Sequence, residues 1–176
     1  LIAGDVYDKP YLRWRRSSFL IIFLCELSKR KVQIFIISGN HDSAERMAFG
    51  GRLMKESGVY VAPVYAGKTQ AVVLEDEWGA INIYLLPFVK PANVKRFFED
   101  EQIENYTDAI RVAVEQMKLN TDERNVLVTH QFVTGAKRSE SEDISVGGTD
   151  NVDASVFDEF DYVALGHIHG PQKIGR

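Results

Sequence analysis

The chain has 176 residues and a formal net charge of −4, with 21 basic against 25 acidic side chains. A composition of 45% hydrophobic and 26% charged residues is that of a folded globular domain, and it excludes disordered, collagen-like and coiled-coil chains. The single Cys25 excludes an internal disulfide and a multi-cysteine zinc module, and it fits an intracellular, reducing compartment. The longest apolar run, at residues 19–25, is too short to cross a bilayer, so we expect no membrane span.

Hydrophobic patterning predicts an α/β domain in which strands alternate with helices. The predicted strands cover residues 1–3, 32–37, 59–62, 71–74, 81–86, 126–129 and 162–165. The predicted helices cover residues 11–30, 43–57, 93–100 and 108–119. The strand at 32–37 (VQIFII) is continuously apolar, which is typical of a strand buried on both faces. The polar segment at 135–150 is predicted to be a long surface loop.

Two local features refine this prediction. In the helix at 43–57 we expect Met47, Leu53 and Met54 to face inward, and Gly58 to end the helix. The strands at 71–74 and 81–86 are expected to pair antiparallel through the short turn between them.

Four of the predicted strands end in side chains that can bind a metal ion. These side chains are Asp5, Asn40, His41, His130, His167 and His169. The chain has 4 His residues, and every one of them lies at such a strand end. Open α/β sheets place their ligands at the carboxyl ends of strands, so we expect these groups to form a site.

The types of ligand indicate the chemistry. Carboxylate, amide oxygen and imidazole together suit Mn²⁺, Fe²⁺ or Zn²⁺, whereas Ca²⁺ prefers oxygen ligands throughout. The set is too large for one ion. Two ions about 3.5–4 Å apart would clamp the attacking and leaving oxygens of an in-line phosphoryl displacement, with Asp5 as the bridge. The sequence therefore predicts phosphoester hydrolysis.

Four motifs in this order resemble those of the calcineurin-like metallophosphoesterases. They are Gly4-Asp5-x-x-Asp8, Gly39-Asn40-His41-Asp42, the strand-terminal His130 and Gly166-His167-x-His169. The segments VTHQFVTGA at 128–136, GGTDNVDASVF at 147–157 and DYVALGHIHGPQ at 161–172 are more narrowly similar to the DNA double-strand-break repair nucleases of that superfamily. The resemblance covers nearly all of the chain. It implies a four-layer αββα sandwich with a di-metal site at the carboxyl ends of the strands.

The resemblance also implies a role for each site residue. Asp5 would bridge two divalent ions, expected to be Mn²⁺. The second ion would be completed by Asn40, His130 and His167, and the first would be bound by His169. His41 would face the scissile phosphate, to stabilise the transition state or protonate the leaving oxygen. Asp42 would orient His41 or its loop, and Asp8 would be structural or support the ligands.

The implied function is that of a metal-dependent DNA nuclease subunit in the cytoplasm. Such a subunit hydrolyses phosphodiester bonds at double-strand ends and hairpins, as a 3′ to 5′ exonuclease and as an endonuclease, in recombination, replication and repair. Its expected partners are DNA and an ATPase subunit, with a homodimer inside a heterotetramer. Residues 1–176 are expected to be a partial nuclease domain, because the family's first Asp-x-His motif and its C-terminal capping region lie outside them. The isolated chain is therefore expected to have little activity.

Two other interpretations stay open from the sequence. A different metallophosphoesterase, acting on nucleotides or phosphoproteins, would cleave a chromogenic phosphodiester but not duplex DNA. A chain without the upstream Asp-x-His would be a non-catalytic scaffold that has lost its first metal.

The segment at 11–22 (YLRWRRSSFLII) departs from the family pattern, through a local frameshift or through divergence. The basic and aromatic cluster at 13–16 has the look of a nucleic-acid contact, but a solvated helix face is the favoured interpretation. Four apolar side chains are assigned to the core, although the resemblance implies that the helices in these two regions pair across a two-fold dimer. They are Phe19, Phe23, Met47 and Met54.

Overall fold

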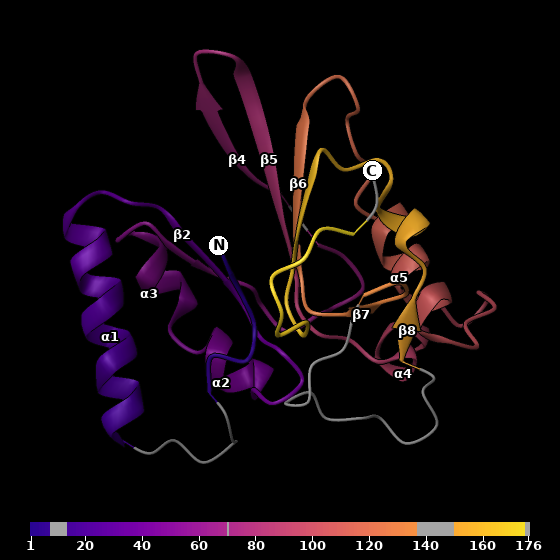
Figure 1. Cartoon of the computed structure of the whole chain (residues 1–176), viewed down its shortest axis with the longest axis horizontal. Coiled ribbons are helices and arrows are strands. Elements are labelled where there is room, and N and C mark those ends of the chain that lie inside the picture. The colour runs from indigo at the N-terminus through magenta and orange to yellow at the C-terminus, as the bar shows by residue number, and fades with distance from the viewer. Residues whose placement is uncertain (8–13, 70, 137–149, 175–176) are drawn as a thin grey trace.

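The computed structural model describes residues 1–7, 14–69, 71–136 and 150–174 (Figure 1). The strands are β1 (Ile2–Ala3), β2 (Ile34–Ile37), β3 (Val59–Val61), β4 (Ala71–Asp76), β5 (Gly79–Leu86), β6 (Arg124–Thr129), β7 (Phe132–Val133), β8 (Asn151–Val152) and β9 (Tyr162–Leu165). The helices are α1 (Trp14–Lys29), α2 (Ala44–Ala48), α3 (Gly51–Lys55), α4 (Pro91–Lys95) and α5 (Tyr106–Glu115), with a 3₁₀ turn at Ala154–Phe157. No helix in these ranges is long and apolar enough to cross a membrane.

The strands form two main sheets. The first has the order β1-β2-β3 and is parallel throughout. The second has the order β4-β5-β6-β9, in which β5, β6 and β9 are parallel and β4 pairs antiparallel with β5. A third, two-stranded sheet joins β7 to β8 in parallel. The antiparallel pairing of the strands around residues 71–86 is as predicted.

Successive side chains along β2 and β5 point to opposite faces of their sheets. One set from each strand packs between the two sheets. On β2, Phe35 and Ile37 pack into an apolar cluster together with Ile83 and Leu85 of β5. The neighbouring side chains of β2 pack on the other face, in a cluster that includes Leu24 of α1. Each of these strands is therefore buried on both faces, as the apolar run at 32–37 predicts.

The opposite face of the second sheet is covered by α4 and α5. Tyr84 and Leu86 of β5 lie in one cluster with Ile110 of α5 and Val94 of α4. The layers are thus helix, sheet, sheet and helix, with α1, α2 and α3 on one side and α4 and α5 on the other (Figure 1). The predicted four-layer αββα sandwich is confirmed.

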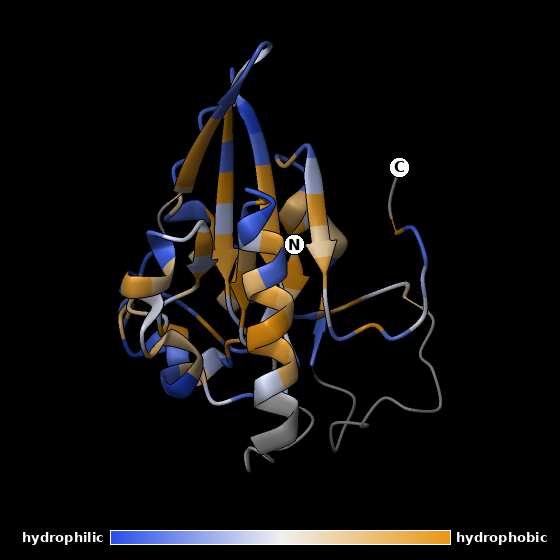
Figure 2. Cartoon of the chain, turned by 90° about the vertical axis from the view of Figure 1, so that its left-hand side faces the viewer, coloured by the Kyte–Doolittle hydropathy of each residue, from blue (hydrophilic) through white to orange (hydrophobic). Residues whose placement is uncertain are grey.

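The helix α1 begins within the predicted range 11–30, whose first three residues lie outside the described part. Its inner face packs through Leu20, Leu24 and Leu27. The assignment of Phe19 and Phe23 to the core is wrong, because both lie on the outer face of the helix and are exposed. The helix runs along the front of the molecule in Figure 2. The side chains of the basic cluster at 13–16 and of Asp8 also lie outside the described residues.

The prediction of one helix at 43–57 is wrong, because the chain breaks into α2 and α3. Ser43 caps α2 by accepting from the Arg46 N–H, and Phe49 ends it in an extended conformation. Gly50 follows at φ 77°, a left-handed conformation that favours glycine and cannot continue a helix. The break turns Leu53 outward, with 81% of its surface exposed, while Met47 is buried as predicted.

The remaining differences lie at element ends. The predicted helix at 93–100 begins at Pro91, since proline fits the first turn of a helix, and ends at Lys95. The helix predicted at 108–119 is capped earlier, by Asn105, whose side chain accepts from the Asp108 N–H. The strands β7 and β8 have two residues each, too few for a periodic pattern to predict them.

Candidate metal centre

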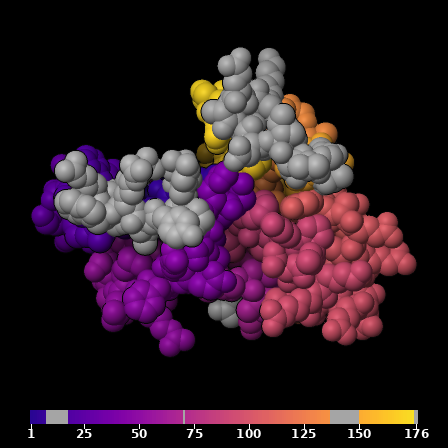
Figure 3. Space-filling model, turned by 90° about the horizontal axis from the view of Figure 1, so that it is seen from below, coloured from indigo at the N-terminus to yellow at the C-terminus, as the bar shows by residue number. Residues whose placement is uncertain are grey.

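The carboxyl ends of four strands meet at one edge of the sandwich. Because β1 and β2 are parallel in one sheet and β6 and β9 are parallel in the other, their polar successors are brought together. Main-chain hydrogen bonds hold this edge: Gly166 N donates to Thr129 O at 2.8 Å and Phe88 N donates to Ser38 O at 3.0 Å. Figure 3 views the molecule from below, the side toward which β5 and β6 run in Figure 1.

Three side chains with ligand atoms form a compact group at this edge. One ligand atom each from Asp5, His130 and His167 lies within 4.8 Å of the others. The amide of Asn40 joins them, since its Oδ1 is 2.9 Å from Nε2 of His130 and 3.1 Å from Nδ1 of His167. The polar groups that follow the four strands thus lie close together, as the sequence predicts.

The imidazole of His130 is oriented by the main chain. Its ring is 1% exposed, and its Nδ1 lies 2.6 Å from the carbonyl oxygen of Ala3, which can only accept a hydrogen bond. Nδ1 therefore carries a proton. The other nitrogen, Nε2, faces the Asn40 oxygen and the Asp5 carboxylate at 3.1 Å. A carbonyl that fixes the tautomer so that the second nitrogen is presented as a ligand is the arrangement found at histidine metal sites.

The charge of this group suits a cation. Burial raises the pKa of Asp5, but the hydrogen bond and charge of His130, the backbone N–H of His41 and the charge of His41 outweigh burial and hold that pKa below 3.8. Asp5 is therefore ionised at neutral pH. One carboxylate, one amide oxygen and two imidazoles converge on one small volume. The donor set fits a divalent metal ion.

Two glycines make the close approach of these strands possible. A Cβ on Gly166 would collide with the Ala3 carbonyl oxygen and with Nδ1 of His130. A Cβ on Gly39 would collide with the backbone and the carboxylate of Asp5. Both positions therefore need glycine for space, which is why a glycine precedes the ligand in each motif.

Two candidate ligands have unusual backbone conformations. Asp5 has φ 49° and His167 has φ 70°, both in the left-handed region that non-glycine residues seldom adopt. Such conformations persist where the surroundings hold them, and they cluster at functional sites.

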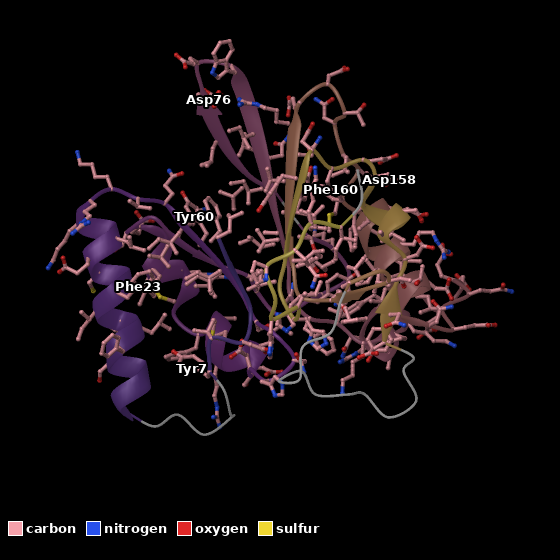
Figure 4. The ribbon with its side chains drawn as sticks, in the orientation of Figure 1. Tyr7, Phe23, Tyr60, Asp76, Asp158 and Phe160 are labelled. Atoms are coloured by element: carbon pink, nitrogen blue, oxygen red, sulfur yellow. The ribbon has the colours of Figure 1, made fainter. Side chains whose placement is uncertain are left out.

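Asp42 ties the loops of the site together. Its Oδ2 accepts from the backbone N–H groups of Gly39 at 2.9 Å and Val6 at 3.1 Å, and its Oδ1 accepts from that of Tyr7 at 2.8 Å. Figure 4 labels Tyr7 where the segment after β1 passes α2. The carboxylate of Asp42 thus joins the loop after β1 to the loop after β2, which is a positioning role.

His41 and His169 lie differently from the three-residue group. The backbone N–H of His41 donates to Oδ1 of Asp5 at 3.1 Å, which places His41 directly beside the group. His169 is exposed and lines a cleft of 1240 Å³ with residues of β9 and of the segment after it. Among the described residues, the structure does not bring His169 into the group with Asp5.

Aromatic side chains that the sequence patterns did not single out pack against the histidines. Phe88 meets His130 edge-on, with ring centroids 6.3 Å apart, and Phe132 meets His167 edge-on at 6.1 Å. Tyr106 lies beside Phe88 at 6.4 Å. The sequence patterns passed over Phe88 because its ring carries no ligand atom, and its place at this edge follows from the parallel pairing of β5 with β6.

Comparison with known proteins agrees with this geometry. The sequence profile of the calcineurin-like phosphoesterase family matches residues 1–171, and the chain belongs to this family, whose members use divalent metals. The chain is also 34% identical over 182 aligned positions to the D subunit of nuclease SbcCD from Staphylococcus epidermidis. That alignment covers 100% of this chain and 47% of the relative, so the chain spans about half the length of the curated relative. The family and the relative together support a metal-dependent phosphoesterase related to a nuclease.

Proposed function

We propose that this chain is the core of a metal-dependent DNA nuclease that hydrolyses phosphodiester bonds at double-strand ends and hairpins. The observation that carries the proposal is the convergence of Asp5, Asn40, His130 and His167 where the two sheets meet. Membership of a phosphoesterase family and the similarity to a nuclease subunit support it.

The proposed metal site holds two Mn²⁺ ions. Bound ions would supply Lewis-acid stabilisation of the phosphoryl oxygens and an activated water. In this proposal Asp5 would contribute to holding both ions, Asn40, His130 and His167 would hold the second, and His169 would help to hold the first. The ionised carboxylate of Asp5 and the fixed tautomer of His130 support these assignments.

The chain supplies its own groups for handling the substrate. We assign His41 to the scissile phosphate, where it stabilises the developing charge or protonates the leaving oxygen. Its backbone N–H is held by Asp5, so the imidazole starts from a fixed point beside the metal ligands. Asp42 supports His41 by fixing the main chain on both sides of the site.

The proposed partners are DNA, a second copy of the chain and an ATPase subunit of the SbcC type. This assembly is a homodimer within a heterotetramer, working in the cytoplasm in DNA recombination, replication and repair. The exposed apolar side chains of α1, Phe19, Ile22 and Phe23, support the dimer. A contiguous apolar patch on a protein surface marks a site of interaction with another molecule. The similarity to a subunit of a two-component nuclease supports the ATPase partner.

The experiment measures hydrolysis of end-labelled duplex and hairpin DNA with Mn²⁺, for this chain and for a longer product of its gene. We propose that residues 1–176 are a partial nuclease domain that gains activity, including 3′ to 5′ exonuclease and endonuclease cleavage, only with flanking segments. Cleavage by the longer product that EDTA abolishes is the expected result. If the longer product hydrolyses a chromogenic phosphodiester but does not cleave DNA, the protein is a phosphoesterase with another substrate and not a DNA nuclease. If neither product binds a metal ion, the interpretation as a non-catalytic scaffold is the one that remains.

A further inference from the structure

The end of β5 differs from the other parallel strand ends around the metal centre. β5 runs parallel to β6, so its carboxyl end lies at the edge that bears His130. The strands β1, β2, β6 and β9 are followed at this edge by carboxylate, amide or imidazole groups. β5 is followed instead by Pro87 and Phe88. An aromatic ring therefore stands at the edge where the other strands present ligands.

Phe88 is held in place by three contacts. Its backbone N–H donates to Ser38 O at 3.0 Å, which fixes it to the loop that carries Asn40. Its ring packs perpendicular to the ring of His130, at an interplanar angle of 87°. On another side it meets Tyr106 at an angle of 37°. Phe88 and Tyr106 both remain only half-buried, unlike Leu86 and Val89 on either side of Phe88.

The chemistry of this pair is that of a stacking surface. Partly exposed aromatic rings offer flat apolar faces on which nucleobases stack, whatever the base. Lys90, two residues after Phe88, is exposed and adds a positive charge to the same loop. A fully paired duplex hides its base faces, whereas frayed ends and hairpin loops offer them.

We propose that Phe88 and Tyr106 form an aromatic platform that stacks an unpaired nucleobase beside the metal centre. The platform rests on the proposed nuclease function and specifies its substrate: DNA with at least one unstacked base next to the scissile phosphate. It makes the chain select ends and loops over the interior of a duplex.

The test measures binding without cleavage. Fluorescence anisotropy in EDTA gives the Kd of the chain for a single-stranded oligonucleotide, for the same oligonucleotide with abasic sites, and for a blunt duplex. The wild type is expected to bind the normal strand more tightly than the abasic strand, by about 5- to 150-fold for each stacked base. Phe88→Leu and Tyr106→Leu are expected to weaken binding of the normal strand by a similar factor and to leave binding of the abasic strand unchanged.

Two controls separate stacking from general damage. Phe88→Tyr and Tyr106→Phe keep the rings and should keep the affinity. Trp78→Leu removes an exposed aromatic ring at the opposite end of β5 and should change neither Kd.

The outcomes distinguish this proposal from the proposed function. A wild-type chain that binds normal and abasic strands equally, or a Phe88→Leu variant that binds like the wild type, overturns the platform and leaves the nuclease standing. A wild-type chain that binds no DNA at all overturns the platform, and a longer product of the gene that binds none overturns the nuclease as well. The abasic comparison needs no variant, so it decides even if a substitution impairs folding.

Discussion

Nδ1 of His130 lies 2.6 Å from the carbonyl oxygen of Ala3, a contact that joins the two sheets at the metal centre. Because the carbonyl oxygen can only accept, Nδ1 is the donor in this contact, and Nε2 is the nitrogen that faces Asp5 and Asn40. A main-chain carbonyl of the first sheet thus orients a candidate metal ligand of the second sheet.

Removing this ligand should remove metal binding. We expect His130→Ala to weaken Mn²⁺ binding roughly 100-fold or more, since even outer-shell changes cost 10- to 100-fold. Isothermal titration calorimetry measures the effect. Asn125→Ala is the matched control, because Asn125 is also buried, with 1% exposure, at the other end of the same strand. It should destabilise the fold and leave the Mn²⁺ affinity unchanged; equal affinity in His130→Ala and the wild type would contradict the site.

Gly166 should tolerate no side chain. We expect Gly166→Ala to cost about 1–3 kcal/mol of unfolding free energy, because its Cβ overlaps the Ala3 carbonyl and the His130 ring. Metal affinity should fall with it, since the same overlap displaces His130. Urea denaturation and calorimetry measure the two effects. Gly170→Ala is the control, because a Cβ there meets nothing within 4 Å. Equal loss in both variants would show that the crowding is not responsible.

The positions of the site residues could be predicted because each polar group follows a short apolar strand. The strand Ile34–Ile37 is buried throughout, so the first polar residues after it emerge at the sheet edge. Asp5, Asn40, His130 and His167 all obey this rule. Phe88 obeys it too, but its aromatic ring carries no ligand atom, so its place became visible only from the parallel pairing of β5 with β6.

The break between α2 and α3 could not be predicted from periodicity. Met47 and Met54 have the spacing of one continuous helix face, and both pack inward. The break depends on Gly50 taking a left-handed conformation, which glycine permits but does not dictate. For the same reason Leu53 could not be recognised as exposed.

Replacing one carboxylate oxygen of Asp42 by an NH₂ group should lower both the stability of the fold and its affinity for Mn²⁺. Asp42→Asn would place an NH₂ group opposite a backbone N–H that now donates, and the unfolding free energy should fall by about 1–3 kcal/mol. The Mn²⁺ affinity should also fall, because the loops after β1 and β2 lose their tie. Asp158→Asn makes the same change of charge at an exposed position and should leave both quantities unchanged. An Asp42→Asn chain with wild-type stability would contradict the positioning role.

Acid should remove the stabilisation that the ion pair between Asp76 of β4 and Arg124 of β6 provides. Asp76 pairs with both guanidinium nitrogens of Arg124, at 2.5 and 3.0 Å, and this pairing together with the Trp78 N–H lowers the pKa of Asp76 below 3.8. A lowered folded-state pKa means that the pair stabilises above pH 3.8 and that its contribution disappears as pH falls through the lowered value. Asp76→Asn should therefore be less stable than the wild type at pH 7, and the difference should vanish at lower pH.

Urea denaturation at both pH values measures the effect of Asp76. The control is Asp122→Asn in the neighbouring turn, where the residue contributes through its backbone N–H to Asn120. A difference between wild type and Asp76→Asn that persists unchanged in acid would show that the carboxylate charge is not its cause.

The outer face of α1 should mediate self-association. We expect Phe19→Glu with Phe23→Glu to convert a dimer into a monomer, because the charges would be buried in the interface. Sedimentation velocity over a range of concentrations measures the mass. Phe19 and Trp78 are each 79% exposed, so Trp78→Glu is a matched control on a distant hairpin and should leave the dimer intact. A wild-type chain that stays monomeric at all concentrations would refute the proposed homodimer.

The division of the candidate ligands between the two sheets has a consequence for when a metal site could form during folding. Asp5 and Asn40 follow strands of the first sheet, and His130 and His167 follow strands of the second, so this group comes together only when the two sheets pack. Metal binding is coupled to folding when the unfolded chain has no preformed site. An ion would therefore bind only after the two sheets have packed together. In a nascent or partly unfolded chain these side chains would lie apart, and the candidate metal site would form only once the sandwich is complete.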